Sequence, residues 1–269
     1  MFDWTWGTFG TTHFVTLIAA IALIFAIYVW LHDESRKKQI VVLFFLSLSG
    51  IAAIIYNLVA WGTPWEYLPL HLCSLNAMLL PYAVLTRKKW ACNLLLLWSL
   101  GSYVALILNY NMADAKLLSA PFFFYYFPHV LEAGIPILLF KLDLVKRDPK
   151  CIKSTLSITF ICYTIIHVIN VAINNGIIGP GNIDVNYMFS YAPDNPLLQF
   201  FWMLIPHRYF YMFLIIPIII IYLGWWYLPE LLKLHKSKRG LRKRLRAVEE
   251  YYDEYEEEYI EEIIEKKYD

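Results

Sequence analysis

The sequence predicts an all-α fold: a polytopic membrane bundle of seven transmembrane helices, with the N-terminus outside and the C-terminus in the cytoplasm. Two observations carry this prediction. Of the 269 residues, 59% are apolar and only 17% are charged, and the apolar residues are gathered into long runs. The loops between these runs alternate between basic and non-basic, and this alternation fixes the direction of each crossing.

Seven apolar runs are long enough to cross a hydrocarbon core of about 30 Å. We expect each to be helical, because a backbone in lipid must satisfy its own hydrogen bonds. In chain order the runs are Thr11–Leu31, Ile40–Trp61, Leu68–Thr86, Trp90–Tyr110, Ser119–Phe140, Ser154–Asn175 and Leu198–Tyr227. Only the sixth loop, Gly176 to Pro196, is long enough for structure of its own, and its glycines and prolines favour turns.

The basic residues of the loops set the orientation. The N-terminus, the second loop and the sixth loop contain no Lys or Arg, and the fourth contains only Lys116. The first, third and fifth loops contain Arg36, Lys37, Lys38; Arg87, Lys88, Lys89; and Lys141, Lys146, Arg147, Lys150, Lys153. Because basic loops face the cytoplasm, the N-terminus is expected outside.

Two regions follow from this pattern: a transmembrane domain over 1–228 and a charged cytoplasmic tail over 229–269. The tail is basic over 233–246 and acidic over 249–269. Its basic part suits anionic lipid headgroups. Its acidic part fits a solvated helix, a disordered segment, a fold-back onto the basic part, or a dock for a cytoplasmic or membrane protein partner. No base-stacking pattern accompanies the basic residues, so no nucleic acid is expected as a partner.

The N-terminal segment and the cysteine spacing give no sign of a cleaved signal peptide, a zinc knuckle or a disulfide framework. No basic residue precedes the first apolar run and no small-residue cleavage site follows it, so we expect this helix to be retained. The four cysteines, at 73, 92, 151 and 162, have no CxxC spacing, so neither a zinc knuckle nor a disulfide framework is expected. The sequence thus predicts a multi-pass protein of the cell membrane, without a cofactor, whose partners include membrane lipids.

Polar side chains inside the apolar runs point to a site, since ionisable groups are costly in a membrane. Converting their positions to depth places them toward the outer half, so we expect one polar cavity there, lined by the third, fifth, sixth and seventh runs, with the sixth loop over its mouth. The alternative is a set of scattered residues that make hydrogen bonds between helices. The residues are His71, Cys73, Asn76, His129, Glu132, His167, Asn170, Asn174, His207 and Arg208.

These residue types suit nucleophilic catalysis. A thiol becomes a nucleophile when a base or a cation favours its thiolate. The base for Cys73 must come from another run, and His129 and His207 are the candidates. Glu132 is three residues after His129 and shares its helical face, so we expect it to orient the imidazole.

Supporting roles remain for the other side chains. Arg208 suits a phosphate or carboxylate headgroup, and His71 or Asn76 would help to hold an oxyanion. The histidines and Glu132 could also supply three ligands to zinc and leave a position open for water. No HExxH or paired-Asp pattern accompanies them, so no metal is predicted.

Several motifs resemble the YwaF family of bacterial integral membrane proteins. Their order, their spacing and the number of runs match over about residues 10–225, whereas the first ten residues and the tail lie outside the resemblance. The motifs are Pro69-Leu70-His71-Leu72-Cys73-Ser74-Leu75, Phe127-Pro128-His129, Asn186-Tyr187-Met188-Phe189 followed by Pro193, and more loosely Trp202…Pro206…Tyr209.

This resemblance implies an activity. Eukaryotic relatives of the family are described as acyltransferases that move polyunsaturated acyl chains onto ether phospholipids with a catalytic cysteine and histidine. Carried over by motif, these are Cys73 and His129, and we expect Asn186 and Tyr187 of the sixth loop to bind substrate. The chain departs from the family at Asn109-Tyr110-Asn111, where a Thr-Pro-Asp-like stretch is usual, and at His207-Arg208. Both departures bear on the substrate class.

Two hypotheses result. In the first, the protein is a lipid acyltransferase or hydrolase with Cys73 as nucleophile, His129 as general base and Glu132 as orienting residue. In the second, it is a non-catalytic binder or transporter of a lipid or small polar solute that docks a partner through its tail. The second makes His207 and Arg208 more important than Cys73.

Overall fold

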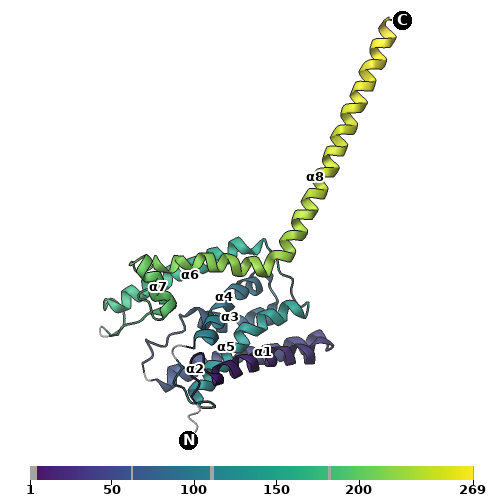
Figure 1. Cartoon of the computed structure of the whole chain (residues 1–269). Coiled ribbons are helices and arrows are strands. Elements are labelled where there is room, and N and C mark those ends of the chain that lie inside the picture. The colour runs from purple at the N-terminus through teal and green to yellow at the C-terminus, as the bar shows by residue number, and fades with distance from the viewer. Residues whose placement is uncertain (1–4, 62, 110–111, 181–182, 269) are drawn as a thin grey trace. The chain divides into compact units, whose positions relative to one another are not determined.

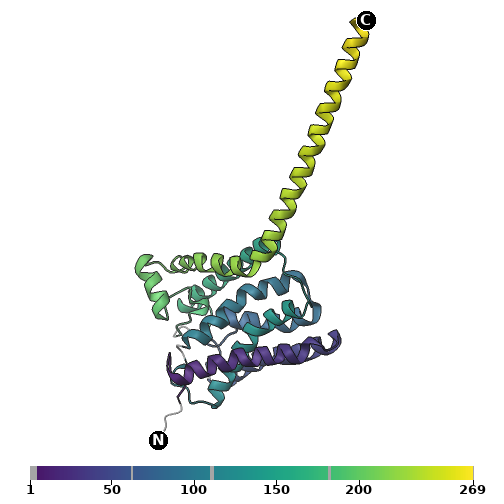
Figure 2. The same cartoon turned by 45° about the vertical axis from the view of Figure 1, so that its right-hand side comes forward.

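The computed structural model is helical, which confirms the predicted class (Figures 1 and 2). It describes residues 5–61, 63–109, 112–180 and 183–268, with side chains up to 245 and at 248. The helices are α1 (Thr11–His32), α2 (Arg36–Ala60), α3 (Leu72–Thr86), α4 (Lys89–Leu108), α5 (Ala120–Lys141), α6 (Cys151–Asn174), α7 (Pro196–Leu204) and α8 (Ile216–Tyr268), with 3₁₀ turns η2 (Tyr187–Phe189) and η3 (Tyr211–Ile215).

The number of long spans is six rather than seven. Among the described residues, α1, α2, α4, α5, α6 and the segment Tyr211–Leu245 are long and apolar enough to cross a membrane. The predicted third run, Leu68–Thr86, becomes the 15-residue helix α3, because residues 68–71 are not helical. At 1.5 Å per residue α3 is about 22 Å long, less than the hydrocarbon core.

The predicted seventh run is also interrupted. Its first part forms α7, and the chain then leaves the helical conformation before η3 begins at Tyr211. His207 and Arg208 therefore lie in a connection between helices, not inside a span as predicted. The residues assigned to the charged tail are helical as far as Tyr268 and belong to α8. The chain divides into two compact units at 223/224, and the helical bundle described below belongs to the first.

Apolar side chains cover the outside of the bundle. Large aliphatic and aromatic residues of α1 are more than half exposed, among them Ile18, Ile21 and Phe25, and Val168 of α6 is 61% exposed. Contiguous exposed apolar surface of this kind is rare on soluble monomers. Together with the long apolar helices, it identifies a multi-pass membrane protein.

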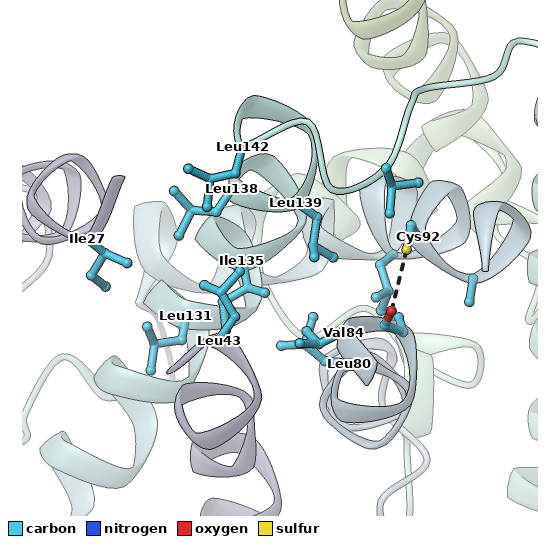
Figure 3. Close-up of a cluster of buried hydrophobic side chains, with 14 of the residues drawn as sticks. Ile27, Leu43, Leu80, Val84, Cys92, Leu131, Ile135, Leu138, Leu139 and Leu142 are labelled. Atoms are coloured by element: carbon cyan, nitrogen blue, oxygen red, sulfur yellow. Dashed lines mark hydrogen bonds between the residues drawn. The ribbon is translucent and has the colours of Figure 1, made fainter. Parts of the chain in front are cut away.

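One end of the bundle gathers three connections that are far apart in the sequence. A buried apolar cluster joins the α1–α2, α3–α4 and α5–α6 turns through Leu31, Val84, Cys92 and Leu142, and Figure 3 shows Cys92 donating to the Ala83 carbonyl at this end. These three turns are the basic loops, so the predicted alternation of charge corresponds to one physical end. We call it the basic end.

The opposite end holds the N-terminal segment and the α4–α5 connection. The Trp6 backbone N–H donates to the Ala115 carbonyl at 2.9 Å, and His13 Nε2 lies 2.8 Å from the Leu106 carbonyl oxygen. The buried Trp6 ring packs edge-on against Phe122. The chain then runs back to the basic end through two segments. Residues 68–71, which are not helical, enter the bundle, and the short helix α3 completes the crossing.

Two glycines allow helices to approach closely. A methyl group at Gly50 of α2 would lie 2.6 Å from the Ala77 Cβ of α3, and one at Gly134 of α5 would lie 2.1 Å from the Ile24 side chain of α1. Small residues at such crossings bring membrane helices into backbone contact. The crossing at Gly50 sets the position of α3 against α2, next to the residues described below.

Candidate functional site

The side chain of Glu132 lies at the centre of four helices. It is only 4% exposed, and the Ser102 hydroxyl of α4 donates to its Oε2 at 2.8 Å. Its Oε1 faces Gly50 of α2, where an added Cβ would lie 2.9 Å away. A buried carboxyl group needs such a donor, because an unsatisfied one is costly in an apolar interior.

Asn76 of α3 contacts the same part of α5. Its Nδ2 donates to the Glu132 carbonyl oxygen at 3.4 Å. That carbonyl is free because Pro136, four residues later, has no N–H to donate to it. Asn76 is fully buried, and its Oδ1 has no hydrogen-bond partner among the described residues.

His129 lies one turn before Glu132 and is half-buried. Its Nδ1 is 2.6 Å from the carbonyl oxygen of Tyr125, and the two rings are 4.4 Å apart. A carbonyl can only accept, so Nδ1 carries the proton and Nε2 of the neutral ring is left as a base. The Tyr125 carbonyl therefore takes the orienting place that we predicted for the Glu132 carboxylate.

Cys73 lies in the first turn of α3, which packs on α5. The thiol is free and half-buried. Asn76 of α3 donates to Glu132 of α5, and Cys73 and His129 each lie one turn before these residues, on helices that run in the same direction. The structure thus brings Cys73 and the His129 face of α5 to the same part of the bundle. We call Cys73, Asn76, Ser102, Tyr125, His129 and Glu132 the inner cluster.

Residues of α6 form a second polar set with the sixth loop. Asn170 Nδ2 donates to the Tyr187 carbonyl and to the Ser190 hydroxyl, each at 2.8 Å, and Asn170 Oδ1 accepts from the Tyr187 N–H at 3.0 Å. His167 Nδ1 is 3.0 Å from the same Ser190 hydroxyl, and Asn174 pairs with both backbone groups of Val185. We call this set the loop cluster.

The sixth loop is turn-rich, as expected, and contains only one short 3₁₀ turn in the part that is described. Asn186 Oδ1 accepts from the N–H groups of Tyr191 and Ala192, closing a tight turn. Met188 and Phe189 have left-handed φ values of 51° and 54°. This conformation is strained for such side chains, so the surrounding hydrogen bonds must hold it in place.

His71 connects the two clusters. It is the N-cap residue of α3, two residues before Cys73, and its ring is 5.6 Å from that of Tyr187 and 5.5 Å from that of Phe189. The sixth loop therefore covers the start of α3. The loop contacts His71, two residues before Cys73, and its predicted place over the mouth of a polar cavity stays a prediction.

Arg208 and His207 lie farther along the same loop system. The Arg208 guanidinium stacks 3.9 Å above the ring of Tyr191 and donates to its hydroxyl at 2.7 Å. Both Arg208 and His207 are exposed, and His207 pairs with the Arg208 carbonyl. The His207 ring contacts Phe210 and the Arg208 carbonyl in this exposed connection, whereas His129 lies on the α5 face that packs on α3. His129 is therefore the better-placed base for Cys73.

The residues predicted to line one polar cavity thus fall into two groups that His71 connects. Cys73, Asn76, His129 and Glu132 belong to the inner cluster; His167, Asn170, Asn186, Tyr187, His207 and Arg208 belong to the loop system. Among the described residues no three His, Cys, Asp or Glu side chains are grouped so that they could hold a metal ion.

Sequence reasoning missed three members of these groups. Ser102 could have been found as a polar residue inside the apolar fourth run. Tyr125 could have been found by its spacing, because it lies four residues before His129 on the same helical face. Ser190, which joins His167 to Asn170, had none, because its role depends on a loop folding back over α6.

A family model decides the membership of this chain: the model of the TMEM164 family matches residues 8–228. The protein belongs to the TMEM164 family. The match covers every helix that contributes to the inner cluster and the loop cluster, and it ends before the charged tail. No curated protein matches the chain significantly, and no solved structure does.

Proposed function

We propose that this TMEM164-family protein is a membrane lipid acyltransferase or hydrolase, with Cys73 as nucleophile and His129 as general base. The observation that carries the proposal is the hydrogen bond of 2.6 Å between His129 Nδ1 and the Tyr125 carbonyl. It leaves Nε2 basic, one turn before the Asn76–Glu132 contact, as Cys73 is on α3. The resemblance of the Cys73 and His129 motifs to the YwaF family, with its acyltransferase relatives, supports the same pair.

The reaction would proceed in two transfers. His129 takes the proton of the Cys73 thiol, and the sulfur attacks the carbonyl carbon of an acyl ester in a lipid. The ester C–O bond breaks, the released oxygen takes the proton from His129, and the acyl group remains on sulfur as a thioester. A lipid hydroxyl or water then attacks the thioester and restores the thiol, so the acceptor decides between transfer and hydrolysis.

The other predicted residues have supporting roles in this proposal. Asn76 uses its amide nitrogen on the Glu132 carbonyl, and its unpaired Oδ1 is an acceptor, so we assign the oxyanion role to other donors. With Ser102, Glu132 fixes α3, α4 and α5 around Cys73. We assign the protein to the cell membrane, with the basic end toward the cytoplasm.

Lipid turnover by the full-length protein in phospholipid vesicles tests this function. Cys73→Ala and His129→Ala should each abolish acyl exchange, whereas Cys162→Ala, another half-buried cysteine of a membrane helix, should leave it unchanged. Turnover that persists in both Cys73→Ala and His129→Ala would refute the proposed pair.

One observation favours the second hypothesis, a non-catalytic binder of phosphate headgroups or small polar solutes. The exposed Arg208 is held by stacking on Tyr191 and by a hydrogen bond to its hydroxyl, and a pre-positioned guanidinium is suited to bidentate contact with phosphate. On this hypothesis Arg208→Ala abolishes lipid binding while Cys73→Ala does not. A partner held by the acidic tail would be lost from pull-downs when residues 249–269 are deleted.

A further inference from the structure

The helix that carries Cys73 begins inside the bundle. Leu72, its first residue, packs against Gly101 of α4, and Gly101 is seven residues before the end of that helix. At 1.5 Å per residue this places the start of α3 about 10 Å inside the non-basic end. Residues 68–71, which lead into it, are not helical. Non-helical backbone at membrane depth is tolerated where protein covers it or where it lines a polar cavity.

The first turn of α3 offers unused donors. The N-cap is His71, whose side chain accepts no hydrogen bond from the first turn of the helix. The first helical N–H is that of Leu75, which donates to the His71 carbonyl at 3.0 Å. The first N–H groups of α3 therefore have no partner within the helix, and they lie in the same turn as the Cys73 thiol, which an acyl carbon would join.

Tyr187 brings a further donor to the same place. Its side chain is completely buried against Leu70 and Leu72 at the start of α3, with its ring 5.6 Å from that of His71. Its hydroxyl has no hydrogen-bond partner among the described residues. Its backbone is fixed on both sides by Asn170. A buried hydroxyl held rigidly without a partner is unfavourable for stability, and such a group calls for a functional explanation.

These observations concern different parts of the chain and converge on one point. We propose that the uncapped N-terminus of α3 and the Tyr187 hydroxyl form the oxyanion site for the acyl carbonyl. The proposal rests on the proposed function. When the Cys73 sulfur bonds to the carbonyl carbon, the C=O electron pair moves to oxygen, and the N–H groups and the Tyr187 hydroxyl donate to that oxygen. When the ester C–O bond breaks, the electron pair on the oxygen forms the C=O bond again.

The sixth loop then has a defined purpose. The three hydrogen bonds of Asn170 and the left-handed backbone at Met188 and Phe189 set the position of the Tyr187 hydroxyl over α3. An oxyanion site is effective when its donors are fixed before reaction, because no reorganisation is then needed. Tyr187 would touch the reacting oxygen, whereas Asn170 would be a positioning residue.

The test compares two reactions of Cys73 in the full-length protein in phosphatidylcholine vesicles. An activated acyl ester, such as a p-nitrophenyl ester of a fatty acid, passes through an oxyanion. Iodoacetamide alkylates the same thiol by direct displacement of iodide, without forming one. Removing one oxyanion donor typically slows acylation by about 100- to 1000-fold. Tyr187→Phe should therefore slow acylation by such a factor and leave alkylation unchanged.

The matched control is Tyr126→Phe. The Tyr126 hydroxyl donates to the Thr16 carbonyl in a buried cluster at the non-basic end, and this variant should leave both rates unchanged. Because the Tyr187 hydroxyl has no partner among the described residues, Tyr187→Phe should also melt no earlier than the wild type. Reduced activity without reduced stability is the expected signature of a donor that serves the reaction.

Two results would overturn the oxyanion site. Acylation at the wild-type rate in Tyr187→Phe would show that the hydroxyl contributes nothing, and an equal fall in acylation and alkylation would show that the residue only shapes access to Cys73. The proposed function fails in a different way, by lipid turnover that survives Cys73→Ala. The oxyanion site and the acyl-transfer function are therefore tested separately.

Discussion

The Nδ1 atom of His129 lies 2.6 Å from the carbonyl oxygen of Tyr125, one turn earlier on α5. This contact fixes the tautomer of the ring, because the carbonyl accepts and Nδ1 must donate. The free Nε2 is then the basic atom, on α5 one turn before the contact between Asn76 and Glu132, and Cys73 lies one turn before Asn76 on α3. The proposed chemistry depends on this relationship more than on any other in the molecule.

The crossing at Gly50 predicts a destabilising variant. In Gly50→Ala the new methyl group would lie 2.6 Å from the Ala77 Cβ and 2.9 Å from Glu132 Oε1, so α2 and α3 must separate. Overpacking of this kind typically costs about 1–3 kcal/mol. Thermal unfolding in detergent should show the loss. In the control, Gly224→Ala, the methyl group meets open space, and its melting temperature should not fall. Equal melting temperatures for the two variants would contradict the close approach.

The hydrogen bond from Ser102 predicts a difference between two substitutions of Glu132. Glu132→Gln keeps an acceptor for the Ser102 hydroxyl, whereas Glu132→Leu leaves that buried donor unpaired. An unsatisfied buried group costs about 1–3 kcal/mol. The leucine variant should therefore unfold at a lower temperature than the glutamine variant. A leucine variant as stable as the glutamine one would mean that this bond does not hold α4 to α5.

The role of Asn170 predicts faster local opening of the sixth loop. Asn170→Ala removes three hydrogen bonds to Tyr187 and Ser190, each worth about 1 kcal/mol net. At tenfold per 1.4 kcal/mol, the Tyr187 amide should exchange its hydrogen roughly 100-fold faster. In the control Asn175→Ala, the lost bond is to Val171 of the same helix, so exchange at Tyr187 should not change. Unaltered exchange in Asn170→Ala would show that these hydrogen bonds do not hold the sixth loop in place.

The basic end predicts the orientation of the chain. Leu118, in the α4–α5 connection, is 90% exposed, and Asp143 is an exposed residue of the α5–α6 connection at the basic end. Leu118→Cys should react with a membrane-impermeant maleimide on intact cells, and Asp143→Cys only after permeabilisation, each compared with the unsubstituted protein. The reverse pattern would invert the topology, and labelling of both on intact cells would refute the crossing of α5.

Much of this fold follows from the sequence, because long apolar runs and basic loops reflect the hydrocarbon thickness and the cytoplasmic charge bias directly. The start of α3 does not. Leu68–Thr86 is one continuous apolar run, but its first residues pack with Val185 and Tyr187 from over a hundred positions later. Hydropathy cannot register that contact, so the run was predicted as a full span.

The candidate site shows the same division. His129 and Glu132 share a face by spacing, and the polar character of each was visible in the sequence. Which acceptor His129 would use was not visible, because the backbone carbonyl of Tyr125 carries no signature in residue type. His207 and Arg208 were placed at depth by assuming an unbroken helix, and the break between α7 and η3 moved them to an exposed connection.

The most direct test of the central claim is labelling of Cys73 in the purified protein with a lipid-like, thiol-reactive acyl probe, followed by mass spectrometry of the modified peptide. Wild type, Cys73→Ala and His129→Ala are compared. The account predicts an acyl adduct on Cys73 in the wild type that is absent from Cys73→Ala and strongly reduced in His129→Ala. A Cys73 that stays unmodified, or that is acylated equally well without His129, would contradict the account and favour the binding hypothesis.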